Sequence, residues 1–187
     1  MTHRIVLLGA PGAGKGTQAV RLADRFQIPA ISTGELFRQH MSRGSELGKL
    51  AANYINDGNL VPDEITVWMV RDRFRREDVQ GGFLLDGFPR TVAQADALDE
   101  MLGENGLTAV VELWVDVEEV IPRLIGRAAT EGRSDDTAEV VRQRIRVYRE
   151  QTKPLHEFYV GQGILREINA VGEIDQITER IVAVLER

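Results

Sequence analysis

The sequence GAPGAGKGTQ at residues 9–18 constrains the fold more than any other stretch of the chain. It follows an apolar run at residues 5–8 and precedes an amphipathic segment at residues 19–26, so it stands where a strand turns into a helix. Its glycines allow the backbone to curl until successive N–H groups point inward, and the following helix adds partial positive charge at its N-terminus. The pattern predicts a phosphate-binding loop in which Lys15 supplies a mobile charge for the outer phosphates.

One detail of this loop differs from the general pattern GxxxxGK[ST]. The residue after Lys15 is Gly16, and the hydroxyl follows one place later, at Thr17. We therefore expect that the loop does not donate a side-chain hydroxyl directly to magnesium. The alternative, a glycine-rich turn that only joins a strand to a helix, is weaker because strand, loop, lysine and helix occur in register.

The composition is that of one soluble globular domain. Of the 187 residues, 43% are hydrophobic and 28% are charged. No apolar run approaches the roughly 20 residues that span a membrane. The net charge of −6 argues against binding to nucleic acid through a general basic surface. The absence of cysteine excludes disulfides and a thiolate zinc site. We expect a cytoplasmic protein with no zinc and with neither a nucleic-acid nor a membrane partner.

Apolar runs alternate with amphipathic segments along the chain, which favours a parallel sheet covered by helices. We expect strands at residues 4–9, 28–32, 82–86, 109–116 and 166–171. We expect helices at residues 14–26, 64–76, 92–102, 137–150 and 175–185, with two short helices within 36–56 broken at Gly44 and Gly48. The fold class is then α/β, a three-layer α/β/α P-loop domain with a five-stranded parallel sheet and with inserts at residues 32–61 and 127–133.

Several side chains near these elements have expected structural roles. Ser32 or Thr33 has the sequence context of a helix cap, and a ligand contact is an equal alternative for this pair. Asp63 would cap the helix at residues 64–76. Trp68 would be buried in the core rather than stack on a base, and Trp114 would lie in a buried strand.

Residues 82–91, GFLLDGFPRT, are the second informative stretch. An apolar strand there ends at Asp86, and the carboxyl ends of parallel strands face the ligand crevice of an open sheet. Asp86 is therefore a candidate to hold magnesium through water; the alternative is that it only caps the turn. Arg90 emerges from the same bend. Arg144 lies close to the apolar stripe of its helix, where its partner would be a bound phosphate or an internal carboxylate.

A phosphate loop, a strand-end carboxylate and arginines on separate segments suit phosphoryl transfer. That reaction needs two phosphate-bearing reactants held in line, little water, and positive charge around the transferring group. Residues 32–61 and 127–133 would act as flaps that close over the reactants.

Several motifs resemble those of the adenylate kinases, a family of nucleoside monophosphate kinases, in the family's order and spacing. They are GAPGAGKGTQ at 9–18, STGELFR at 32–38, GNLVPDE at 58–64, GFLLDGFPRT at 82–91 with Gln94, and RSDD at 133–136. The resemblance runs essentially from end to end. Five residues separate Arg127 from Arg133, which resembles the short-lid type. The resemblance implies a monomer that reversibly converts Mg·ATP and AMP into two ADP.

The resemblance also implies roles for individual residues. The catalytic set would be Lys15, Arg90, Arg123, Arg127, Arg133 and Arg144. ATP would be bound by Gly12, Ala13, Gly14, Lys15, Gly16, Thr17, Arg127 and Gly172, with Asp86 positioning the waters of Mg²⁺. AMP would be bound by Thr33, Arg38, Asn59, Leu60, Val61, Gly87, Phe88, Pro89, Arg90, Gln94, Arg133 and Arg144, with Gln94 contacting the adenine. Asp135 and Asp136 resemble acidic positions that close the lid.

Two other functions stay open at this point. A UMP/CMP kinase would have the same fold, and contacts from Thr33 and Gln94 favour adenine over a pyrimidine only modestly. A nucleotide-gated switch would share the loop but would not need a second phosphate site or scattered arginines. ADP formation that depends on AMP would distinguish the kinase from the switch.

Overall fold

A computed structural model describes residues 2–116, 119–124, 126 and 137–186. Its centre is a sheet of five strands in the order β2-β3-β1-β4-β5, and each pairing is parallel. The strands are β1 (His3–Gly9), β2 (Ala30–Ser32), β3 (Gly82–Asp86), β4 (Ala109–Trp114) and β5 (Leu165–Asn169). The expected α/β class and five-stranded parallel sheet are confirmed.

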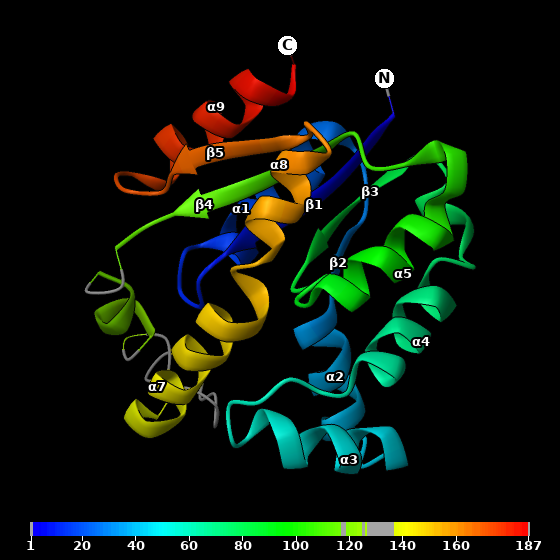
Figure 1. The fold of residues 1–187 in the computed structure, drawn as a ribbon, viewed down its shortest axis with the longest axis vertical. Helices are drawn as coiled ribbons and strands as arrows, with labels where there is room; N and C mark the ends of the chain where they lie inside the picture. Colours follow the sequence, from blue (N-terminus) through cyan, green and yellow to red (C-terminus); the bar gives the residue numbers. More distant parts are fainter. Residues whose placement is uncertain (1, 117–118, 125, 127–136, 187) are drawn as a thin grey trace.

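Helices connect successive strands and surround the sheet (Figure 1). They are α1 (Lys15–Phe26), α2 (Thr33–Ser42), α3 (Glu46–Ile55), α4 (Asp63–Arg73), α5 (Val92–Leu102), α7 (Ala138–Val147), α8 (Leu155–Gly161) and α9 (Ile174–Leu185). Residues 119–124 are also helical. Short 3-10 turns lie at η1 (Glu77–Val79) and η2 (Gly103–Asn105), and η4 (Tyr148–Thr152) is a π-helix. Within the described ranges, no helix combines the length and apolar character that a membrane span needs.

The two faces of the sheet bury separate hydrophobic clusters, which makes three layers. Alternate side chains of β1 point to opposite faces. Ile5 and Leu7 join the cluster that contains α1 and α9, whereas Val6 and Leu8 join the cluster that contains α4, α5 and α8. Because both faces are covered, the central strands are apolar throughout rather than alternating.

A third, smaller cluster holds α2 and α3 together, at the bottom of Figure 1. Its buried residues are Phe37, Ala51, Val61 and Met69. The expected break at Gly48 is wrong, because Gly48 lies inside α3. A Cβ atom there would come within 2.1 Å of the His40 carbonyl oxygen, so the glycine serves the close approach of the two helices.

Two tryptophans are exposed, contrary to expectation. Trp68 is 60% exposed because Thr66, Met69 and Val70 form the buried side of α4, and at about 100° per residue Trp68 falls on the opposite side. Trp114 is 54% exposed at the last position of β4; it shares one face with Val110 and Glu112, and burial on that face falls toward the end of the strand.

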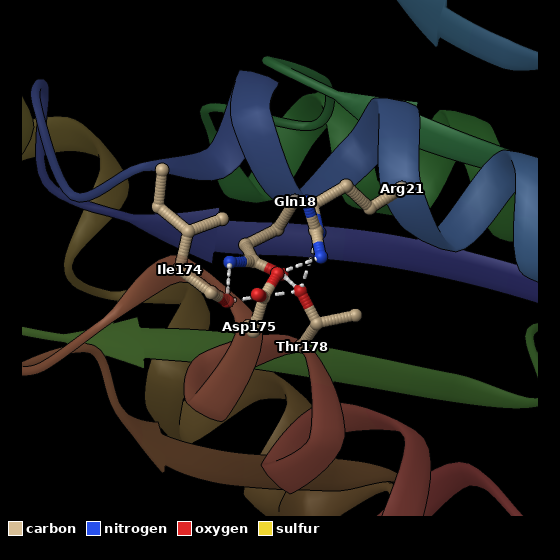
Figure 2. A network of polar contacts seen from close by, with 5 residues as sticks. All are labelled: Gln18, Arg21, Ile174, Asp175 and Thr178. Atoms are coloured by element: carbon tan, nitrogen blue, oxygen red, sulfur yellow. Dashed lines mark hydrogen bonds and ion pairs between the residues drawn. The ribbon is translucent and has the colours of Figure 1, made fainter.

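Polar contacts hold α9 against α1, as Figure 2 shows. The Gln18 amide nitrogen donates to the Ile174 carbonyl (3.1 Å), and the Thr178 hydroxyl donates to the Gln18 amide oxygen (2.8 Å). Arg21 donates to the Thr178 hydroxyl and forms an ion pair with Asp175. The first turn of α9 is thereby fixed beside the first turn of α1.

Candidate active site

The phosphate loop connects β1 to α1. Gly9, Gly12 and Gly14 have φ values of 137°, 82° and 95°, a backbone conformation that favours glycine. A Cβ atom at Gly12 would also lie 2.8 Å from a Val120 methyl carbon. Gly14 is the N-cap residue of α1 and offers no side-chain cap, so the first N–H groups of the helix point to where an anion would bind.

Lys15 folds back over this loop. Its ammonium nitrogen lies 2.7 Å from the Gly9 carbonyl oxygen and 2.9 Å from the Ala10 carbonyl oxygen, and it donates to both. The charge is thus held at the loop itself, where a small rotation of a flexible side chain would bring it to a phosphate.

The loop opens into a cavity of about 790 Å³, within the range of small-molecule sites. The walls come from the loop, the start of α2, residues 58–61, the turn after β3 and the turn before α9. Most of the expected site residues line it, namely Gly12, Ala13, Gly14, Lys15, Gly16, Thr17, Thr33, Arg38, Asn59, Leu60, Val61, Asp86, Gly87, Arg90, Gln94, Arg123, Arg144 and Gly172. Segments far apart in sequence therefore face one space.

Thr33 and Arg90 meet at the carbonyl oxygen of Gly87. The Thr33 hydroxyl donates to it at 2.8 Å and the Arg90 Nε donates at 2.9 Å. Ser32 rather than Thr33 caps α2, because its hydroxyl accepts from the Glu35 N–H. Gly87 has φ 79°, and a Cβ atom there would lie 3.0 Å from the Thr33 hydroxyl oxygen and 3.5 Å from the Arg90 Nε. The turn after β3 is therefore shaped around these two side chains.

Gln94 is 1% exposed and its amide is held on both sides. Its oxygen accepts from the backbone N–H of Arg90 at 2.8 Å, and its nitrogen donates to Asp63 at 2.7 Å. The expected cap role of Asp63 is wrong: α4 has Pro62 at its N-cap position and no side-chain cap bond. Asp63 instead accepts from Gln94 and from the Thr91 hydroxyl. Its place in the GNLVPDE motif was the signal for a site role.

Two expected AMP contacts lie outside the main cavity lining. Phe88 is fully buried in the cluster beneath α4, α5 and α8. Pro89 lines a smaller cavity of about 60 Å³ together with Lys15, Arg90 and Arg144. Their positions fix the path of the turn, so any contact from Phe88 to a ligand would come from its backbone.

The smaller cavity brings in a residue for which the sequence predicted no site role. Tyr148 lines it, at the start of the π-helix η4. Burial, and secondarily the charge of Glu112, raises the pKa of Tyr148 to about 12, so its hydroxyl stays neutral near pH 7. Thr152, at the end of η4, donates to the Arg90 carbonyl oxygen at 2.9 Å. The π-helix thus holds the backbone of Arg90 through this hydrogen bond.

Arginines reach the main cavity from four separate segments: Arg38 from α2, Arg90 from the turn after β3, Arg123 from the helical residues 119–124, and Arg144 from α7. Arg123 also forms an ion pair with Glu119 at 3.3 Å. Four guanidinium groups and Lys15 around one cavity favour a ligand with several phosphates. Arg127, Arg133, Asp135 and Asp136, for which the sequence predicts roles, lie outside the described residues.

Asp86 is the last residue of β3 and faces the loop. Its Oδ2 lies 3.7 Å from where a Cβ atom of Gly16 would stand. A single carboxylate beside a phosphate loop suits Mg²⁺, which prefers oxygen ligands and keeps several waters. Asp86 is thus the residue of this wall that fits an ion bound together with the phosphates.

One cavity joins a phosphate loop to a second cluster of anion-binding side chains, and this fold and site define a P-loop nucleoside monophosphate kinase. The family model described as adenylate kinase matches residues 7–164. Among curated relatives, adenylate kinase of Thermobifida fusca is 56% identical over 97% of both chains. That of Kocuria rhizophila is 52% identical over 98% of this chain and 99% of its own. The chain belongs to the adenylate kinase family.

Proposed function

We propose that the chain catalyses the reversible, Mg²⁺-dependent transfer of the terminal phosphoryl group of ATP to AMP, which gives two ADP. The observation that carries this proposal is the continuous cavity shared by the phosphate loop and the cluster around Gly87. A donor and an acceptor nucleotide would meet there with their phosphates between the arginines. The relatives are named adenylate kinases, which agrees with this reaction.

The donor half would be built on the loop. The N–H groups of residues 12–17 would hold the phosphates of ATP, because the glycine backbone curls around this space and the start of α1 adds partial positive charge. Lys15 would move from its carbonyl partners to the outer phosphates. Gly172, with φ 121° in the turn before α9, would approach the adenine of ATP through its backbone.

The acceptor half would be built on the start of α2 and the turn after β3. Arg38 and Arg90 would hold the phosphate of AMP, and Thr33 keeps the turn in place through Gly87. Gln94 would contact the adenine with the parts of its amide that face the cavity. Residues 59–61 would close this pocket from the other side.

Transfer needs positioning and charge rather than covalent catalysis. An oxygen of the AMP phosphate would form a bond to the terminal phosphorus of ATP while the bond from that phosphorus to the bridging oxygen breaks. Arg123 and Arg144, with Arg127 and Arg133, would stabilise the charge on the transferring group. Mg²⁺ bound with ATP would neutralise phosphate charge, and Asp86 is the side chain that would hold it, through water. The cytoplasmic location and the monomer stay predictions.

ADP formation from ATP and Mg²⁺ tests the proposal, with AMP, UMP, CMP, dTMP or no acceptor offered in parallel. We expect fast turnover with AMP. Preference for UMP or CMP would move the chain to the pyrimidine-specific alternative with the same fold. A rate that no acceptor raises above that of ATP alone would overturn the kinase assignment.

A further inference from the structure

We propose that Asp63 is a positioning residue for the acceptor base: its carboxylate locks the Gln94 amide in one orientation, which matches adenine and opposes guanine. The inference rests on the proposed function, in which Gln94 meets the base of the monophosphate. It concerns Asp63, for which the sequence predicted only a helix cap.

The carboxylate of Asp63 binds two groups of the first turn of α5. One oxygen accepts from the Gln94 Nε2 at 2.7 Å, and the other accepts from the Thr91 hydroxyl at 2.9 Å. The same hydroxyl accepts from the Gln94 backbone N–H at 3.1 Å and so caps α5. Asp63 therefore fixes both the backbone and the side chain of Gln94.

These partners leave the Gln94 amide one orientation. A carboxylate only accepts hydrogen bonds, and the Arg90 backbone N–H only donates. The amide nitrogen must therefore face Asp63, and the amide oxygen must face Arg90 at 2.8 Å. If the amide flipped by about 180°, its nitrogen would face the Arg90 N–H and its oxygen would face the Asp63 carboxylate. Both hydrogen bonds would then be lost.

The locked amide still has binding capacity toward the cavity. An amide nitrogen carries two hydrogens and an amide oxygen has two lone pairs, and these two contacts use one of each. Adenine presents an amino donor beside the acceptor N1, whereas guanine presents an oxygen acceptor beside an N–H donor. The free lone pair and N–H of a locked amide match adenine, and guanine would need the flipped amide.

Asp63 also joins α4 to α5, so a purely structural clamp is the competing explanation. A clamp would support the whole acceptor pocket, and its loss would lower kcat/KM for AMP and for GMP by the same factor. An orientation lock would instead change the ratio between the two purines. This difference separates the two roles even if the variant is somewhat less stable.

The experiment measures kcat/KM for AMP and for GMP, the KM for ATP and the Tm, in wild type, Asp63→Ala, Asp63→Asn, Gln94→Ala and the double variant D63A/Q94A. We expect D63A to lower kcat/KM for AMP about tenfold and that for GMP less than about threefold, with KM for ATP within about twofold. The double variant D63A/Q94A should have the same kcat/KM for AMP as Q94A, because both changes remove the same interaction.

Asp63→Asn and the added variant Asp72→Ala serve as controls. Asp63→Asn keeps an oxygen for the Gln94 amide, and its own nitrogen can donate to Thr91, so the AMP-to-GMP ratio should stay within about twofold of wild type. Asp72→Ala, on the exposed side of the same helix in a 3.7 Å pair with Arg75, should leave all parameters unchanged. If D63A unfolds too readily for assay, Asp63→Ser carries the same expectation, because its side chain is too short to replace the carboxylate.

Three results would overturn the inference: equal losses for AMP and GMP in D63A, additive losses in the double variant, or an Asp63→Asn variant as impaired as D63A. Wild type with AMP-dependent turnover but an unchanged purine ratio in D63A overturns this inference alone. Wild type with no AMP-dependent turnover overturns the proposed function and this inference together.

Discussion

Two buried glutamines line the cavity and are held in different ways. Gln18 binds Ile174 and Thr178 of α9, so its amide joins two helices that pack in the same core cluster. Gln94 binds the Arg90 backbone and Asp63, which belong to a turn and to a helix start. The first arrangement secures the scaffold beneath the phosphate loop. The second secures the groups around the acceptor nucleotide, so the two halves of the site should respond differently to mutation.

The largest expected effect falls on the phosphate loop. Lys15→Ala should lower turnover by about 10³-fold, because it removes a charge from the developing negative charge of the transferring phosphoryl group. The Tm should change by only a few degrees, since the variant loses two part-buried hydrogen bonds from the Lys15 ammonium to the Gly9 and Ala10 carbonyls. Steady-state ADP formation measures the turnover, and thermal melting measures the Tm. Lys49→Ala, which removes an exposed pair with Glu46, is the matched control. A full-rate K15A variant would remove the loop from the mechanism.

Gln18→Ala should act on stability rather than on nucleotide selection. The substitution removes one buried and one part-buried hydrogen bond and leaves a small void, which should cost about 2–3 kcal/mol in the free energy of unfolding. Urea denaturation measures this, while KM for AMP should stay within about twofold. Gln162→Ala, which removes an exposed amide contact to Asp99, should cost less than about 0.5 kcal/mol. A Q18A variant of normal stability and impaired AMP binding would reverse the comparison.

Thr33→Val should show the opposite pattern, with a larger effect on AMP binding than on stability. Valine keeps the shape of threonine but cannot donate to the Gly87 carbonyl, which Arg90 also binds. We expect KM for AMP to rise about five- to tenfold while KM for ATP stays nearly constant, because only the turn that places Arg90 is loosened. Initial-rate measurements with each nucleotide varied in turn test this. Thr33→Ser, which keeps the hydroxyl, should retain near-normal KM, and equal rises for both nucleotides would contradict the prediction.

Much of the fold and of the loop half could be predicted because few conformations satisfy those residues. Gly9, Gly12 and Gly14 need positive φ between a buried strand and a helix, and that combination has one common outcome. Continuous apolar runs likewise predict strands covered on both faces, which gave the parallel sheet. Such signals are local in sequence, so the predictions did not depend on knowing which distant residues lie across the cavity.

The parts that could not be predicted depend on partners far away in sequence. Asp63 has the local pattern of a helix cap, and only the packing of α4 on α5 brings it to Gln94, 31 residues later. Trp68 lies on a helix with apolar residues on several sides, so the pattern alone could not show which side of the helix is buried. The expected helix at 137–150 gave no warning of the π-helix η4, which adds a residue per turn before α8.

The smallest expected effect concerns a scaffold contact that pH can remove. His156 of α8 lies 2.6 Å from Glu112 of β4, and this hydrogen bond raises the pKa of His156 above its ordinary value of 6.5. Glu167 on β5, Glu157 on α8 and the neutral Tyr148 also face this pair, and the two further carboxylates act in the same direction. Because the folded state holds the proton more tightly, the contribution is complete below pH 6.5 and is lost as pH rises through the folded-state pKa.

His156→Gln should therefore cost up to about 1 kcal/mol in the free energy of unfolding at acidic pH near 6, and almost nothing near pH 9. Urea denaturation of both proteins at the two pH values measures the difference. His40→Gln is the control, since the His40 ring contacts a serine hydroxyl instead of a carboxylate. A cost that grows with pH would mean that the pair stabilises the neutral imidazole. A pH-dependent change in KM for AMP would mean that the scaffold and the acceptor pocket are coupled through η4, because Tyr148 and Thr152 connect Glu112 to Arg90.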